Sequence, residues 1–385
     1  PLLALLLLPI LVLTVGGAEV SPATALSRAS QPVVASAPIP PTPPGDIMAL
    51  VHRPGIFAAA DFHGLDPQRY HLVGGLRTFD WAELETNEGV FNWARMENWL
   101  NMQSDLGKAA AIGISTYNGR CCGGINALPE YLRTNPEILI PVGNDRFVPK
   151  YWHPTYKQAY QRFVTALGER YRNDPRLEWV AIGTGMYGET WACNPWDNDE
   201  LAAAGLTSDL WIETVNEIID WYVDAFSENG QLRKVLMVQS APYTFQARER
   251  REIGFHAASR GVGFSLNTLH PDQEGAVSGV EGSCSFCGMY DMALLYNQVL
   301  PTAFETYHYM LCDPTQVYWG MLNGLDKHPT YLRLNIDLFY DEPLSPPTGP
   351  DKVENLAIFD WVEHYVGVTL ENTPSVWVAM REHRD

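Results

Sequence analysis

A short apolar run, a loop and an amphipathic helix recur along most of this 385-residue chain, and this repeat constrains its fold more than any other feature. Eight such units predict a closed (β/α)8 TIM barrel of the α/β class. The alternative is a doubly wound open sheet, which usually has a Gly-rich phosphate turn after its first strand. No G-x-G-x-x-G follows the first predicted strand here. The predicted strands are 55–59, 75–79, 109–115, 179–183, 234–239, 263–267, 302–305 and 331–335.

The clearest predicted helices are 93–106, 154–171, 210–228, 289–298 and 352–366. The second has apolar residues spaced three and four apart, from Tyr160 to Tyr171. We expect Ser208 to cap the third helix, and Asn229-Gly230 to end it.

The two ends of the chain differ from this repeat. We expect 1–18 to be a signal peptide or N-terminal anchor, because an apolar run of h-region length precedes small residues. Residues 19–45, rich in Pro, Ala and Ser, predict a linker, and 46–370 the barrel. In 371–385 an alternating stretch predicts a C-terminal β-element: the start of a truncated β-domain, or a strand packed outside the barrel. The expected location is secreted or extracytoplasmic, either released or membrane-anchored at the N-terminus.

The composition narrows the partners. A net charge of −19 argues against nucleic acid or an anionic membrane surface. The 12 Trp and 18 Tyr residues include candidate stacking platforms for sugars. Six cysteines allow 15 pairings, so disulfides are possible after export but their pairing is open. Cys284-x-x-Cys287 could instead contribute to a zinc site.

Two glutamates follow predicted strands at the end of the barrel where active sites lie. Glu189 stands in a Gly-rich turn after the fourth strand, beside Trp191, and apolar surroundings raise a carboxyl pKa in a way that suits a general acid. Glu305 ends the seventh strand, opposite the fourth. Two carboxyl groups so placed can flank a glycosidic bond, one as general acid/base and the other as nucleophile of a retaining hydrolase.

The segment around Trp81, Glu85, Glu88, Gly89 and Trp93 resembles the second-strand region of clan A glycoside hydrolases, notably β-galactosidase-like barrels. Gly107-Lys108 before the third strand fits the same pattern. The resemblance implies an acid/base glutamate after strand four and a nucleophile after strand seven, which match Glu189 and Glu305. This sequence differs from the family pattern at two places. Gly188, and not Asn, precedes Glu189, and the usual Trp after strand eight is not evident.

Further polar and aromatic residues near the predicted strand ends are expected to bind substrate, with Arg77 orienting the nucleophile. They are Arg77, Asp80, Trp81, Asn118, His153, Trp191, Trp196, Gln239, Asn267, His270, Tyr307 and His308. No G-x-S-x-G and no H-E-x-x-H occurs, and neither cofactor nor metal is expected.

The sequence therefore predicts a retaining glycoside hydrolase acting on oligo- or polysaccharide. A non-catalytic carbohydrate-binding barrel, and a polysaccharide lyase or other hydrolase on the same fold, are the alternatives. Long loops after strands three, four and six (about 116–153, 190–207 and 268–288) predict a deep pocket. The sugar, its linkage and the oligomeric state stay open.

Overall fold

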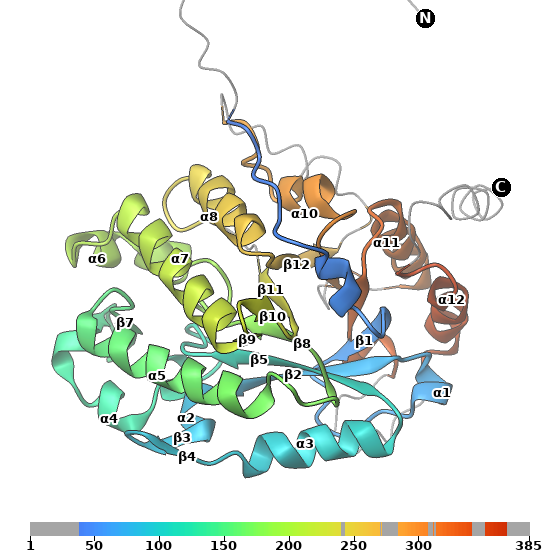
Figure 1. The fold of residues 1–385 in the computed structure, drawn as a ribbon, viewed down its shortest axis with the longest axis horizontal. Helices are drawn as coiled ribbons and strands as arrows, with labels where there is room; N and C mark the ends of the chain where they lie inside the picture. Colours follow the sequence, from blue (N-terminus) through green and yellow to red (C-terminus); the bar gives the residue numbers. More distant parts are fainter. Residues whose placement is uncertain are drawn as a thin grey trace, which may run out of the picture. The chain divides into compact units, whose positions relative to one another are not determined.

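Eight parallel strands close into a barrel in the computed structural model, which describes residues 38–239, 243–269, 271, 284–306, 311, 313–340 and 351–367 (Figure 1). Each strand pairs with its neighbours in sequence order, and the last pairs with the first. The strands are β1 (Gly55–Ala59), β2 (Gly74–Asp80), β5 (Ala109–Ser115), β8 (Leu177–Ile182), β11 (Val235–Gln239), β12 (Gly263–Leu269), β13 (Thr302–Thr306) and β14 (Tyr331–Asn335). The predicted (β/α)8 barrel is confirmed, and every predicted strand overlaps an observed one.

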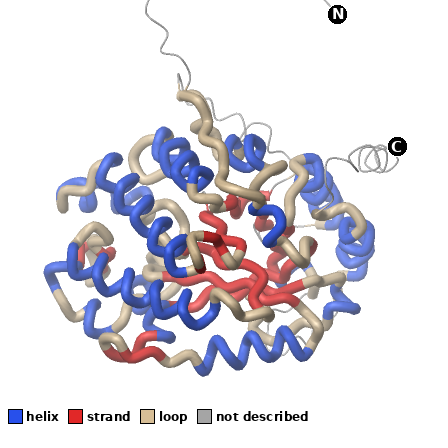
Figure 2. Tube along the Cα trace, viewed as in Figure 1, coloured by secondary structure: helices blue, strands red, loops and turns tan. Residues whose placement is uncertain are grey.

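Helices surround the strands on the outside of the barrel (Figure 2). The main ones are α3 (Ala94–Asp105), α5 (Pro154–Tyr171), α7 (Ser208–Ala225), α8 (Arg248–Ser259), α10 (Asp291–Tyr296), α11 (Pro314–Asp326) and α12 (Val353–Glu363), while α1 (Pro67–Tyr70) is a single turn. In the described parts of the chain, no helix has both the length and the hydrophobicity needed to cross a membrane.

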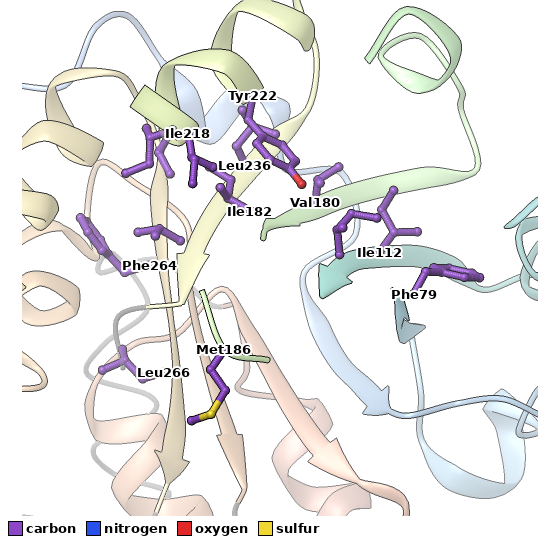
Figure 3. Close-up of a cluster of buried hydrophobic side chains, with 14 of the residues drawn as sticks. Phe79, Ile112, Val180, Ile182, Met186, Ile218, Tyr222, Leu236, Phe264 and Leu266 are labelled. Carbon is purple, nitrogen blue, oxygen red and sulfur yellow. The ribbon is translucent and has the colours of Figure 1, made fainter. Parts of the chain in front are cut away.

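The period-two alternation of the strands divides their side chains between two apolar layers. One set fills the barrel interior: Phe57, Leu76, Ala109, Ala111, Trp179, Val235, Met237, Ala303 and Tyr331. The other set packs outward against the helices, as Val180, Ile182 and Leu236 do with Ile218 and Tyr222 of α7 (Figure 3). This alternation decides which polar residues at the strand ends can reach the barrel mouth.

The start and end of α7 correct two expectations. Thr207, not Ser208, is the N-cap, because the Thr207 hydroxyl accepts from Leu210 N at 3.2 Å. Ser208 instead donates to Glu249 Oε1 at 2.6 Å. The helix ends at Ala225, and Asn229 and Gly230, both with positive φ, form the turn of a hairpin between β9 (Ser227–Glu228) and β10 (Gln231–Leu232).

The long connection after β5 is folded. It contains the 3₁₀ turns η2 (Gly124–Ala127) and η3 (Pro136–Ile138), the helix α4 (Glu130–Arg133), and a hairpin of β6 (Leu139–Pro141) and β7 (Phe147–Pro149). A second small hairpin, β3 (Glu85–Asn87) with β4 (Val90–Phe91), follows the one-turn helix α2 (Trp81–Leu84).

Contacts along the chain separate residues up to Pro38 from the unit that begins at Ile39 and contains the barrel. Residues 1–37 and 368–385 lie outside the described residues. The expected signal peptide or anchor, most of the linker and the C-terminal β-element therefore stay predictions.

Candidate active site

Polar side chains of the inward-facing set lie at the carboxyl ends of β11, β13 and β14, three of four consecutive strands of the barrel. Gln239 follows Met237 on β11, Glu305 follows Ala303 on β13, and Arg333 follows Tyr331 on β14, each two residues after a member of the interior layer. Because residues two apart share a face of a strand, these three side chains project into the barrel mouth. Trp179 of β8 lies beneath them, since the Arg333 guanidinium sits 5.7 Å from its ring centre.

A tight turn after β8 brings Glu189 over this group. Tyr187 and Gly188 both have positive φ (58° and 83°), and Glu189 N donates to Met186 O at 2.9 Å, the pattern of a type I′ turn. Thr190 N then donates to Gln239 O at 3.1 Å, which aligns the chain at Glu189 with the end of β11. The predicted Gly-rich turn thus delivers a carboxyl group to the mouth.

Gly188 explains why this chain lacks the usual Asn before its candidate acid. A Cβ atom on Gly188 would lie 2.9 Å from the backbone oxygen of Ile114 in β5, and the φ of 83° strains any L side chain. No larger residue fits here unless the β5 backbone moves. Gly188 is therefore a requirement of this turn.

The Glu189 carboxyl group is buried, with only 5% of the residue exposed. Its Oε1 atom accepts from Gln239 Nε2 at 3.0 Å and from Asn267 Nδ2 at 2.6 Å. Burial is the main cause that raises the pKa of Glu189 to about 8, and the negative charge of Glu305 adds to it; Arg333, Asn267 and Trp191 act in the opposite direction. Glu189 is consequently protonated at neutral pH.

The Glu305 carboxyl group is held in place by a neighbouring arginine. Its Oε2 atom forms an ion pair with Arg333, whose position on β14 is directly beside Glu305 in the strand register. Arg333 is nearly fully buried and also donates to Ser265 Oγ and, at 3.4 Å, to Gln239 Oε1. A guanidinium is planar and pairs with a carboxylate in a defined geometry, so Arg333 fixes the position of the Glu305 carboxyl group.

Arg333 is a residue that the sequence reasoning missed, and Arg77 was expected in its place. The Arg77 side chain is of the outward-facing set, one residue after Leu76 of the interior layer. Its guanidinium lies 4.5 Å from the Phe79 ring centre and 5.2 Å from that of Phe62, and burial lowers its pKa. The expectation that Arg77 orients the nucleophile was wrong. Arg333 shares the inward face of β14 with Tyr331, a fact that the structure shows and the continuous apolar sequence of the strand does not.

Two further expected binding residues have structural roles. Trp81 is fully buried, donates to Glu85 Oε2 at 2.7 Å, and packs on Tyr160 with 4.9 Å between ring centres. His153 is the N-cap of α5, where its Nδ1 accepts from Thr155 N at 3.3 Å. The full burial of Trp81 corrects its prediction as a binding residue, because its ring belongs to the helix–strand core. His153 is half-buried at a helix end, and substrate binding by His153 stays a prediction.

Asp80 and Asn118 form a pair at the ends of β2 and β5. Asn118 Nδ2 donates to Asp80 Oδ1 at 2.8 Å, and both residues are half-buried. Burial raises the pKa of Asp80, and the Asn118 hydrogen bond opposes that rise. Asp80 is of the inward-facing set, as Leu76 is, so the pair offers hydrogen-bonding groups at the mouth.

The loop after the Glu189 turn carries Trp191 and Trp196. Trp191 is half-buried, whereas Trp196 is 63% exposed. The Arg120 guanidinium lies 5.3 Å from the Trp196 ring centre and forms an ion pair with the fully buried Asp197. This pair connects the loop after β5 to the loop after β8 and supports one face of an exposed indole.

His270, Tyr307 and His308 lie outside the described residues, as does Cys312. Of the other cysteines, Cys193 is a buried free thiol, and sulfur atoms lie adjacent in the pairs Cys121–Cys122 and Cys284–Cys287. The candidate metal-binding group among the described residues is a surface cluster, His71, Asp360 and Glu363, to which neither residue of the Cys-x-x-Cys pair belongs.

A β-galactosidase family model, that of glycoside hydrolase family 42, matches residues 69–195, a segment that runs from α1 through Glu189. No curated protein sequence matches the chain.

Solved structures share the fold at low sequence identity. The catalytic domain of β-amylase from Paenibacillus polymyxa matches with a TM-score of 0.55 and 10% identity, over 81% of this chain and 97% of the other. A GH5-4 broad-specificity endoglucanase from an uncultured bacterium gives 0.52 and 10%, over 83% and 96%. A β-galactosidase from the psychrophilic Marinomonas ef1 gives 0.50 and 13%, over 80% of this chain but only 59% of its own length.

The family match covers the segment in which the sequence resemblance was found, and the closed barrel extends it to the rest of the described chain. The matched segment is thus similar to the β-galactosidases of glycoside hydrolase family 42, and the described chain has the closed (β/α)8 barrel fold that the three solved structures share.

Proposed function

We propose that the protein hydrolyses glycosidic bonds with retention of anomeric configuration, with Glu305 as nucleophile and Glu189 as general acid/base. The observation that carries this proposal is the contrast between the surroundings of two carboxyl groups at one barrel mouth. Glu189 is buried and accepts from two amides, and burial and the charge of Glu305 raise its pKa to about 8, whereas Glu305 forms an ion pair with Arg333. Two carboxyl groups in such contrasting environments suit acid-assisted nucleophilic displacement.

In the first step Glu305 attacks the anomeric carbon and Glu189 donates its proton to the departing oxygen, which leaves a glycosyl ester on Glu305. In the second step Glu189 removes a proton from water, the water oxygen bonds to the anomeric carbon, and the ester bond breaks.

The charges around Glu189 also support its change from general acid in the first step to general base in the second. Glu305 loses its negative charge when it becomes an ester, so one of the causes that raise the pKa of Glu189 disappears. Arg333, which lowers that pKa, keeps its charge. The carboxyl group of Glu189 therefore becomes a better base once the intermediate forms.

The substrate class follows from the family match, which favours a β-galactoside. Trp196, exposed and supported from beneath by Arg120, suits stacking of a sugar ring beyond the cleaved bond. Asp80 and Asn118 offer a carboxylate and an amide to sugar hydroxyl groups.

Rescue by an external nucleophile tests the two roles. We would screen 4-nitrophenyl glycosides, beginning with the β-galactoside, and then add azide to Glu305→Ala and Glu189→Ala. We expect both variants to lose at least about 100-fold in turnover. Azide should give the α-glycosyl azide with Glu305→Ala and the β-glycosyl azide with Glu189→Ala.

Full activity in either variant would contradict the assignment. Binding of oligosaccharide by calorimetry without any product would favour the non-catalytic barrel. A product with an unsaturated sugar end, detected by its ultraviolet absorption, would favour a lyase.

We also propose that the protein acts outside the cytoplasm, on the basis of the apolar run in residues 1–18. Expression with and without 1–18, followed by fractionation of the cells, tests this. Equal cytoplasmic retention of both forms would contradict it.

A further inference from the structure

We propose that Gln239 and Asn267 are positioning residues that confine the acidic proton of Glu189 to its Oε2 atom. The inference depends on the acid/base role proposed above for Glu189. It assigns to these two amides a role different from the substrate binding that the sequence led us to expect.

The hydrogen bonds to Oε1 carry the first step. Gln239 Nε2 and Asn267 Nδ2 both donate to this one oxygen, at 3.0 and 2.6 Å. A carboxyl oxygen has two lone pairs in its plane, and two N–H donors engage both. A proton on Oε1 would have to displace one of them, so the neutral acid carries its proton on Oε2.

The orientation of the Gln239 amide is fixed by its other neighbour. Gln239 Oε1 accepts from Arg333 Nη1 at 3.4 Å. A guanidinium has donors and no acceptor, so the amide oxygen must face Arg333 and the NH2 group must face Glu189. The ion pair of Arg333 with Glu305 thereby sets the position of Gln239, and through it the carbonyl-like oxygen of Glu189.

Backbone geometry places both amides. Gln239 is the last residue of β11, and its backbone is bridged to that of Glu189. Asn267 lies in β12 where the register with β13 shifts between Leu266 and Leu269. Such an irregularity re-aims side chains at the rim of a barrel, and here it brings an amide onto Glu189.

The Oε2 atom is the feature that this arrangement explains. It is buried, and within the described parts of the chain no hydrogen bond of normal geometry reaches it. The indole of Trp191, whose nitrogen also lacks such a bond, interacts with the Glu189 carboxyl group as a hydrogen-bond donor and lowers its pKa. A buried hydroxyl without an acceptor is costly unless a ligand supplies one. The departing oxygen of a glycoside is such an acceptor.

A leaving-group comparison tests the inference on the whole chain. Asn267→Ala removes one donor from Oε1 and leaves the described charged and titratable neighbours of Glu189 (Glu305, Arg333 and Tyr187) in place. We would measure kcat/KM with 2,4-dinitrophenyl and methyl glycosides of the sugar that the wild-type protein cleaves. The dinitrophenolate leaves without protonation, whereas methoxide requires it.

We expect Asn267→Ala to reduce kcat/KM by about 10- to 100-fold for the methyl glycoside and by less than about threefold for the dinitrophenyl glycoside. Equal losses on both substrates would overturn the inference, because they indicate a purely structural role.

A second measurement does not depend on turnover. The Glu189 carboxyl carbon, labelled with 13C and assigned with Glu189→Gln, is titrated by NMR in the wild type and in Asn267→Ala. Since the lost donor stabilises the ionised form, the pKa should rise, by about one unit. An unchanged pKa contradicts the inference. If the wild-type protein cleaves no glycoside, the proposed function fails, and this titration alone decides the role of Asn267.

Discussion

At the scale of single residues, Glu189 couples the activity of the protein to its stability. Its pKa is raised from 4.5 to about 8, mainly by burial and then by Glu305, so the folded state holds a proton that the unfolded state releases. A carboxyl group with a raised pKa costs stability, and the cost grows as pH rises from about 4.5 to about 8. Glu189→Gln should therefore raise the melting temperature more at pH 8 than at pH 5. Calorimetry at the two pH values measures this, and an equal effect at both would contradict the buried neutral acid.

The same pKa predicts the alkaline limb of the pH–rate profile. For the free enzyme we expect kcat/KM to fall above about pH 8, because Glu189 then loses the proton that it donates. Glu189→Gln should retain slow turnover of dinitrophenyl glycosides without that limb. A limb that persists in Glu189→Gln would assign it to another group.

Gly188 gives the third residue-scale prediction. Gly188→Asn, which restores the usual pair of this clan, should lower both activity and stability, the latter by about 1–3 kcal/mol, because its Cβ meets Ile114 O in a positive-φ conformation. Gly107→Asn is the matched control, since Gly107 has a φ of 70° and nothing within 4 Å of its Cβ position. Both variants bear the cost of a positive φ, but only Gly188→Asn also meets the Ile114 backbone oxygen. Comparison of their denaturant unfolding and their kcat/KM therefore separates the backbone strain from the steric clash. An active, stable Gly188→Asn protein would refute the explanation given for this glycine.

At the scale of strands, alternation decides which arginine belongs to the site. Arg333→Met leaves Glu305 without its buried partner, and we expect a loss in kcat/KM of at least about 100-fold. Arg77→Met, on the outward face of β2, should keep activity within about threefold and change stability by about 1 kcal/mol. Similar kinetics for the two variants would argue against the proposed roles.

These strands also show what the sequence can and cannot predict. All eight apolar runs were identifiable, because strands buried on both sides are continuous and hydrophobic. That same continuity hides which face each residue takes, and so Arg77 was expected where Arg333 stands. Glu189 and Glu305 could be selected as candidates because Glu305 lies near the end of β13 and Glu189 lies in the Gly-rich turn that follows β8. Trp81 was misassigned since its nearness to the end of β2 says nothing about its packing on Tyr160. Thr207 and Ser208 are chemically equivalent caps, and only the backbone tells them apart.

At the scale of the whole molecule, the barrel unit begins at Ile39, and the described part of it contains both carboxyl groups. Deletion of residues 1–38 should therefore leave the melting temperature and kcat/KM unchanged within about 2 °C and twofold. Scanning calorimetry and the glycoside assay on the shortened chain check this. A chain that aggregates or loses activity without 1–38 would show that this segment contributes to the barrel.

The close approach of Gly188 to β5 has a consequence for descent. In a protein that has this turn, substitution of Gly188 by Asn alone is not tolerated, because the new side chain would meet the Ile114 backbone oxygen. Nor can a lineage with Asn there adopt this turn while it keeps the amide. A change from one turn to the other requires both the Gly188 turn and the β5 backbone to move. In a phylogenetic tree of related barrels, we therefore expect the substitution at Gly188 and the change in β5 packing on the same branch.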